Sequence, residues 1–285
     1  MSRLAASWHS FITAAWLGWQ IESNWADPFL FAVYSFVKPL SSAGILVVMY
    51  GLISRGNFGT PIFAYIYIGM AFYIYVGSVM TGVSWAIIDD REHYRTLKYI
   101  YVAPVRMPYY LLGRGMARFL IGSISVLITL SFGVLFLKIP IVFTAINWPL
   151  FGVVFVTGIL LLAMMGVLLG GITLMMANHS FLIGDTVASA LYLFSGAIFP
   201  LEVLPAWIRP IGYIMPITYW LELLRRALVG SVSQAFPTFA ALSDAQLLGI
   251  LFGLTILFGS AALLTFQLCE RWAREHSRLD STSNY

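Results

Sequence analysis

Long apolar runs recur along almost the whole of this sequence, and they restrict its fold more than any other feature. Of the 285 residues, 60% are hydrophobic and 10% are charged, whereas a soluble domain carries about 25% charged residues. Several runs exceed the roughly 18 apolar residues that separate a membrane-spanning helix from a buried core helix. The chain is therefore predicted to be an all-α integral membrane protein.

The apolar runs predict six transmembrane helices in a domain over residues 29–285. Their expected bounds are Phe29–Ile53, Pro61–Ile88, Phe119–Leu137, Trp148–Ala177, Phe181–Phe199 and Gln246–Cys269. With both termini on one side, most Lys and Arg residues fall in connections on that same side. Because basic connections favour the cytoplasmic face, both termini are predicted to be cytoplasmic.

Residues 1–28 are predicted to form an amphipathic helix that lies along the inner membrane interface. Apolar side chains repeat at helical spacing on one face, and indole rings prefer the level of the headgroups. The tryptophans concerned are Trp8, Trp16, Trp19 and Trp25. An ordinary amphipathic helix packed on other protein is the alternative, and it occupies the same membrane surface.

Composition excludes several classes of function. The net charge of +4 comes from basic residues spread beside apolar runs, so lipid headgroups are the expected partners and nucleic acid is not. The single cysteine, Cys269, excludes an intrachain disulfide and a zinc cluster. The histidines are far apart, and no lysine follows a glycine as a phosphate-binding P-loop requires. We therefore expect no catalytic site, metal site or nucleotide site in this chain.

Two features inside the apolar runs have alternative interpretations. Lys38 interrupts the first run, where a charge can face a pore or an anionic substrate group. Its long stem can equally reach the inner headgroups. The pairs Gly166/Gly170 and Gly249/Gly253 have the spacing that lets helices approach closely, which more often means packing than function.

The segment 89–118 is densely charged and aromatic, and it separates two apolar runs. Within it, "REHYRTLKYIY" is long enough for two or three helical turns before Pro104 and Pro108 break the pattern. A helix parallel to the membrane, presenting these side chains to a cytoplasmic partner, explains both the charge and the aromatic content. The alternative is a basic loop that only fixes topology.

The segment 196–230 is apolar, but prolines interrupt it too often for an ordinary spanning helix. Irregular backbone at membrane depth occurs only where protein or a water-filled cavity satisfies its polar groups. We therefore predict short re-entrant or interfacial helices on the outer side, before the last span.

These two segments resemble the membrane subunits of type-2 ABC exporters. "REHYRTLKYIYVAPV" is similar to the family's segment after the second span, and "GRGMAR" to the opening of its third. "SGAIFPLEVLPAWIRPIGYIMPITYWLELLRRAL" is similar to the family's outer region. The resemblance covers nearly the whole chain.

The resemblance implies a permease in the plasma membrane that dimerises with a second copy or a close homologue and binds two copies of a cytoplasmic ABC ATPase. ATP and Mg²⁺ would be bound by that partner. It also implies a coupling helix that contacts the ATPase through Arg91, Glu92, Tyr94, Arg95, Thr96, Leu97 and Lys98. In one continuous helix, Glu92 and Arg95 share an exposed face.

The resemblance assigns the outer segment to an exit gate. Its expected members are Phe199, Pro200, Leu204, Pro205, Trp207, Pro216 and Tyr219. The aromatic content would suit a lipophilic molecule or stacked sugar rings, but lipid-facing side chains explain most of it. Export of a lipophilic, drug-like or lipid-like substrate is the first expectation, and a polysaccharide or glycolipid is the alternative. A channel or a secondary transporter without an ATPase is the alternative of a different class, although no internal repeat supports the latter.

Overall fold

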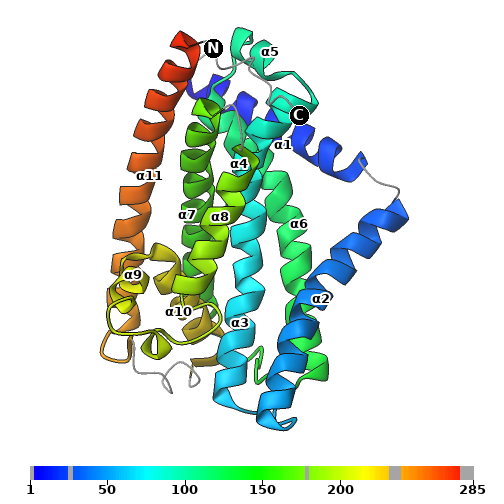
Figure 1. The fold of residues 1–285 in the computed structure, drawn as a ribbon, viewed down its shortest axis with the longest axis vertical. Helices are drawn as coiled ribbons and strands as arrows, with labels where there is room; N and C mark the ends of the chain where they lie inside the picture. Colours follow the sequence, from blue (N-terminus) through cyan, green and yellow to red (C-terminus); the bar gives the residue numbers. More distant parts are fainter. Residues whose placement is uncertain (1–2, 25–27, 177–179, 231–238, 277–285) are drawn as a thin grey trace.

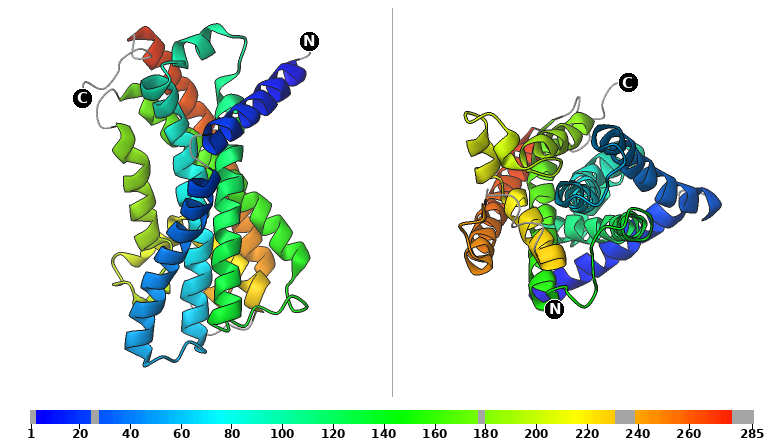
Figure 2. Two further views of the ribbon diagram at one scale, coloured as in Figure 1. Left: turned by 90° about the vertical axis from the view of Figure 1, so that its right-hand side faces the viewer. Right: turned by 90° about the horizontal axis from the view of Figure 1, so that it is seen from below.

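The structure is a computed structural model in which the described residues form helices and connecting loops. It describes residues 3–24, 28–176, 180–230 and 239–276, and no strand occurs among them. The long helices lie side by side, whereas α1 crosses one end of the bundle (Figures 1 and 2). The all-α prediction is thus confirmed for these residues.

The elements follow one another in this order: α1 (Arg3–Asn24), α2 (Pro28–Ser54), α3 (Pro61–Tyr75), the π-helical turn η1 (Val76–Met80), α4 (Thr81–Ile88), the π-helical turn η2 (Asp89–His93), α5 (Leu97–Val102), α6 (Met107–Phe136), α7 (Trp148–Met175), α8 (Ser180–Phe194), the 3₁₀ turn η3 (Leu201–Val203), α9 (Arg209–Ile214), α10 (Pro216–Val229) and α11 (Asp244–Glu275).

Local sequence sets where several of these helices begin. Thr60 and Asn147 cap α3 and α7, accepting bonds from the backbone N–H groups of Phe63 and Leu150. Ser243 and Gln246 form a reciprocal capping box at the start of α11. Proline occupies the first turn of α3, α6, α7 and α10, where its missing N–H has no intrahelical partner in any case.

Five helical segments are long and apolar enough to cross a membrane, counted over the described residues. They are Ser35–Ser54, Pro61–His93, Met107–Phe136, Trp148–Met175 and Asp244–Glu275. The expected span at 181–199 is instead α8, which has 15 residues. At about 1.5 Å per residue, a helix of that length is shorter than the roughly 30 Å hydrocarbon core. The six-span count is therefore not confirmed.

The predicted start of the third span, Phe119, is wrong. α6 already begins at Met107, so Arg114 and Arg118 lie on the long helix and not in the preceding connection. Charged residues usually mark the edge of a membrane-spanning apolar run. The charges of these two arginines are instead paired within the protein, and pairing lets the helix continue through them.

Small residues let α7 lie close to its neighbours. A Cβ at Gly166 would be 2.7 Å from the Met80 carbonyl oxygen, and one at Gly158 would be 1.9 Å from Trp220 Nε1. The expectation of close packing is confirmed for Gly166. It is wrong within this chain for Gly249 and Gly253 on α11, because a Cβ there would meet nothing within 4 Å.

We expect Gly158→Ala to destabilise the protein, because the new methyl group would displace the fully buried Trp220 indole. Overpacking of this kind costs about 1–3 kcal/mol. Thermal unfolding of the detergent-solubilised protein measures the effect. Gly152→Ala on the same helix is the control, since its Cβ would meet no atom within 4 Å. Equal melting temperatures for the two variants would contradict this packing.

Candidate functional site

The charged and aromatic segment between α4 and α6 lies at one end of the bundle. There η2 and α5 sit beside α1 and the last turns of α11 (Figure 1). The elements α9 and α10 lie at the opposite end, so the two segments singled out by the sequence are separated by the length of the spans. The site at the α5 end is built on buried charges.

Asp90 is the centre of that cluster, and it is 1% exposed. Its Oδ2 accepts a hydrogen bond of 2.8 Å from the Tyr110 hydroxyl, and its Oδ1 lies 3.5 Å from Arg114 Nη1. Arg114 Nη2 also lies 3.9 Å from Asp89 Oδ2. These contacts join η2 to α6, and the pairing offsets the high cost of burying a charge.

Arg91 joins the same turn to the end of α7. Its Nη1 donates to the carbonyl oxygens of Thr173 at 3.2 Å and Met176 at 2.9 Å. Its Nη2 pairs with Glu92 Oε1 at 3.0 Å, and its side chain is 1% exposed. The last carbonyls of a helix have no intrahelical partner and carry its negative partial charge. The buried Arg91 guanidinium donates hydrogen bonds to carbonyls at this helix end, and its positive charge complements the negative partial charge there.

A third ion pair ties α1 to α6. Arg118 Nη2 lies 2.7 Å from Glu22 Oε1. Burial raises the pKa of the Glu22 carboxyl, and the neighbouring Arg118 opposes that rise. The two helices also approach closely, since a Cβ at Gly113 would lie 2.4 Å from the Phe11 carbonyl oxygen. α1, α6, α7 and η2 are therefore held together at this end.

The chain turns sharply after η2 and does not continue as one helix. Arg95 has a φ of 52°, in the left-handed region, and the Thr96 N–H returns to the Asp90 carbonyl at 2.7 Å. The expectation that Glu92 and Arg95 share one face of a single helix is therefore wrong. η2 continues the spanning segment as far as His93. The chain then turns, and Leu97 at the start of α5 is buried again.

α5 has a buried face and an exposed face. Leu97 is 1% exposed and belongs to an apolar cluster with Leu111 of α6 and Phe266 of α11. On the other side, Tyr99 is 67% and Val102 is 87% exposed. The short helix thus exposes an aromatic and an aliphatic side chain on one face, while its opposite face is packed against the protein.

The family model described as "ABC-2 type transporter" matches residues 11–229. The chain belongs to the ABC-2 type transporter family. It is therefore a multi-pass membrane permease component of an ABC transporter and not a catalytic domain, and its family implies an ABC ATPase partner. A search of curated proteins found no significant match.

In this permease, the residues predicted to contact the ATPase are divided by burial. Arg91 and Leu97 are buried, Glu92 and Thr96 are intermediate, and Tyr94, Arg95 and Lys98 are exposed. The buried members position the segment instead of offering a surface. Whether the exposed members touch a partner stays a prediction.

Sequence reasoning missed Tyr99 and Val102, the most exposed apolar residues of α5. Their spacing of three, on the side opposite Leu97 and Ile100, is the helical pattern that could have identified them. A single helix predicted across Arg95 gives these two residues a different face, because the left-handed turn at Arg95 separates α5 from η2.

The predicted gate residues lie around η3, α9 and the start of α10, at the opposite end. Pro200, Leu204, Pro216 and Tyr219 are buried, Phe199 is intermediate, and Pro205 and Trp207 are exposed. The structure does not bring them near the charged cluster. Their role as a gate stays a prediction.

Lys38 is exposed in the first turn of the apolar segment Ser35–Ser54 of α2. A lysine stem at an exposed position can reach the headgroups. This interpretation and the alternative role as a pore charge both stay predictions. Among the described residues, no group of three or more His, Cys, Asp or Glu side chains could hold a metal ion.

We expect Arg91→Ala to destabilise the permease strongly. The Met176 carbonyl would lose its Arg91 donor and Glu92 its partner, and leaving a buried polar group unsatisfied costs about 1–3 kcal/mol. Thermal unfolding in detergent provides the measurement. Arg106→Ala, at an exposed arginine in the same connection, should change stability by less than about 0.5 kcal/mol. Equal losses in both variants would show that Arg91 does not anchor α7.

Proposed function

We propose that this permease exports a lipophilic, drug-like or lipid-like substrate and is driven by ATP hydrolysis in a separate ABC ATPase that docks on α5. The observation that carries the proposal is the exposed face of α5, with Tyr99 67% and Val102 87% exposed, on a helix that follows the buried ion pair between Asp90 and Arg114. A surface that receives force must be both accessible and rigidly connected to the spans.

The connection to the spans is specific. Leu97 anchors α5 in the apolar cluster, while Asp90 and Arg91 join η2 to α6 and α7. A push on α5 would therefore move several spans together and not bend a loop. ATP and Mg²⁺ would be bound by the ATPase, and this chain would contribute no cofactor.

The proposed assembly contains two permease chains, identical or closely related, and two ATPase chains. The outward face of α2 supports a need for further apolar contacts, because Ile45 is 73% and Leu52 is 77% exposed. Lipid or the second permease would cover such a surface in the membrane. Pairing would supply the other half of a path that one chain lines on one side only.

The proposed direction and substrate follow from the two ends of the molecule. α5 would face the cytoplasm, so the gate segment would open on the outer side of the plasma membrane. Apolar and aromatic residues dominate that segment, in which Trp207 is exposed and Phe199 is partly exposed. Such a surface suits a molecule that leaves through an apolar environment.

Replacing α5 contacts should weaken the ATPase complex without unfolding the permease. We expect Tyr99→Ala and Arg95→Gly to reduce co-purification of an ABC ATPase encoded beside the permease, and to lower transport per ATP. An interface hot spot contributes about 2 kcal/mol, or more than tenfold in affinity. Glycine is chosen at position 95 because it accepts the φ of 52°.

Arg106→Ala is the matched control, since Arg106 is exposed but lies beyond Pro104. If this variant loses the ATPase while the other two keep it, the docking surface lies after Pro104 and the proposed role of α5 is wrong. Stimulation of ATP hydrolysis by lipophilic compounds, compared with glycans, tests the substrate class.

We further expect both termini to face the cytoplasm. α1 and the last turns of α11 lie at the same end as α5 (Figure 1), so a cytoplasmic ATPase site places them on that side. Reporters that are active on only one side of the membrane, fused after Tyr285, measure this directly. Activity outside the cell would contradict the proposed orientation.

A further inference from the structure

A buried arginine on α10 fastens the backbone that leads into the predicted gate. Arg225 is 1% exposed. Its Nε donates to the Tyr65 carbonyl at 3.0 Å, and its Nη2 donates to the carbonyls of Gly196 at 2.9 Å and Ala197 at 3.2 Å. The guanidinium carbon lies 3.6 Å from the centre of the Tyr65 ring. One side chain thus joins α10, α3 and the turn after α8.

Gly69 makes room for this guanidinium. A Cβ at this position would lie 1.9 Å from Arg225 Nη2 and 2.4 Å from the Ala197 carbonyl oxygen. Gly69 is one helical turn after Tyr65, so the absence of its side chain also leaves the Tyr65 carbonyl open to an outside donor. Both the space and the acceptor therefore depend on glycine at position 69.

The turn after α8 requires such a donor. α8 ends at Phe194, and Gly196 has a φ of 72°, so the chain leaves the helix abruptly and the carbonyls of the turn that follows are outside the helical hydrogen-bond pattern. A buried unpaired carbonyl costs about 1–3 kcal/mol. Arg225 supplies bonds to two of these carbonyls, and the predicted gate residues Phe199 and Pro200 follow directly.

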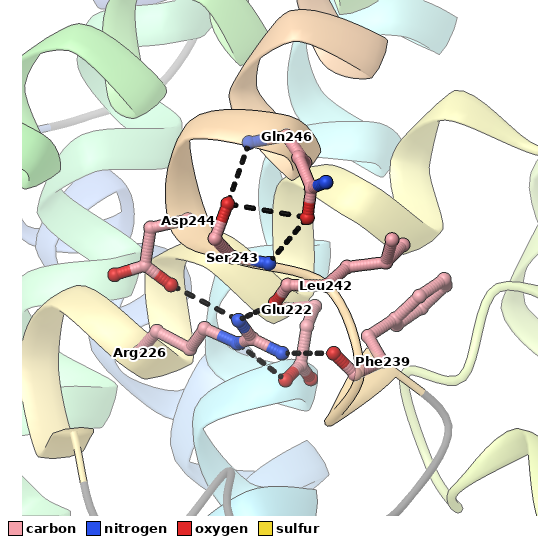
Figure 3. A network of polar contacts seen from close by, with 7 residues as sticks. All are labelled: Glu222, Arg226, Phe239, Leu242, Ser243, Asp244 and Gln246. Carbon is pink, nitrogen blue, oxygen red and sulfur yellow. Dashed lines mark hydrogen bonds and ion pairs between the residues drawn. The ribbon is translucent and has the colours of Figure 1, made fainter.

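α10 itself is fixed on its other side by a second network (Figure 3). Arg226 pairs with Glu222 Oε1 at 3.1 Å and with Asp244 Oδ1 at 3.0 Å, and donates to the Leu242 and Phe239 carbonyls. Burial raises the pKa of the Glu222 carboxyl, and the positive charge of Arg225 opposes that rise more than any other neighbouring charge. The helix that carries Arg225 is thus a fixed support joined to the start of α11.

We propose that Arg225 is a positioning residue that holds the outer gate closed. Its guanidinium clamps the turn at 195–197 against α3, and the gate segment can move away from α3 only when the guanidinium leaves the space at Gly69. The inference rests on the proposed function for the meaning of the gate, but the clamp itself is a property of the fold.

Hydrogen exchange in the purified chain tests the clamp without transport. Gly69→Ala keeps Arg225 but fills its space, and Arg225→Lys keeps the charge but cannot bond three carbonyls while stacking on Tyr65. We expect amides of residues 195–204 to exchange about tenfold faster in each variant. The double variant should exchange no faster than the faster single variant, because both changes remove the same contact.

Two controls separate the clamp from general loosening. Gly77→Ala lies in the same apolar segment, and its Cβ would meet nothing within 4 Å. Gly152→Ala on α7 is the second control, since its Cβ would also meet nothing within 4 Å. Both should leave exchange at 195–204 unchanged. Unchanged exchange in Gly69→Ala or Arg225→Lys, additive effects in the double variant, or equal loosening by either control would overturn the proposal.

Transport then gives a readout that stability alone would not change. With the ATPase bound, Gly69→Ala should lower transport per ATP hydrolysed while ATPase co-purification stays at the parent level. If the exchange results hold but no ATP-driven transport exists in the parent protein, the clamp stands and the proposed function fails. Faster exchange with unchanged coupling would show that the clamp does not control the gate.

Discussion

Hydrogen bonds from buried guanidinium groups to the carbonyls at interrupted helix ends support both working ends of this permease. Arg91 donates to the carbonyls at the end of α7, and Arg225 donates to those of the turn after α8. In an apolar environment, water cannot satisfy backbone groups that a helix leaves unpaired. Arginine suits this task because its planar group offers several donors and stays charged.

One helical segment connects the two arginine sites. Pro61–His93 carries Tyr65 and Gly69 near one end and Asp90 and Arg91 near the other. The π-helical turn η1 interrupts it between them. A displacement at η2 would therefore reach the Arg225 contacts along one element, and the π turn is the place where that element departs from regular α-helical bonding.

Particular residues show how far sequence reasoning reached. The apolar runs located five long segments and the irregular stretch before the last span, and the motifs in 89–118 and 196–230 identified the family. The predicted third span begins too late because Arg114 and Arg118 precede the apolar run, and only their ion pairs show that they lie on the same helix. Tyr99 and Val102 were missed because a single helix was drawn across the left-handed turn at Arg95. The first error concerns ion-pair partners that are distant in sequence, and the second concerns a local turn that the residue pattern does not reveal.

Hydrophobic periodicity and the placement of proline, glycine and capping residues determined by themselves that this chain forms apolar helices and where several of them begin. These are properties of the residues and of their near neighbours, so the sequence contains them in full. Only the tertiary structure decided which charges are buried, because a side chain such as Arg225 can be placed in an apolar interior only when distant carbonyls and a glycine opposite it make room. The same reason explains why the length of α8 and the orientation of α5 appeared only in the fold: each depends on contacts between segments far apart in the chain.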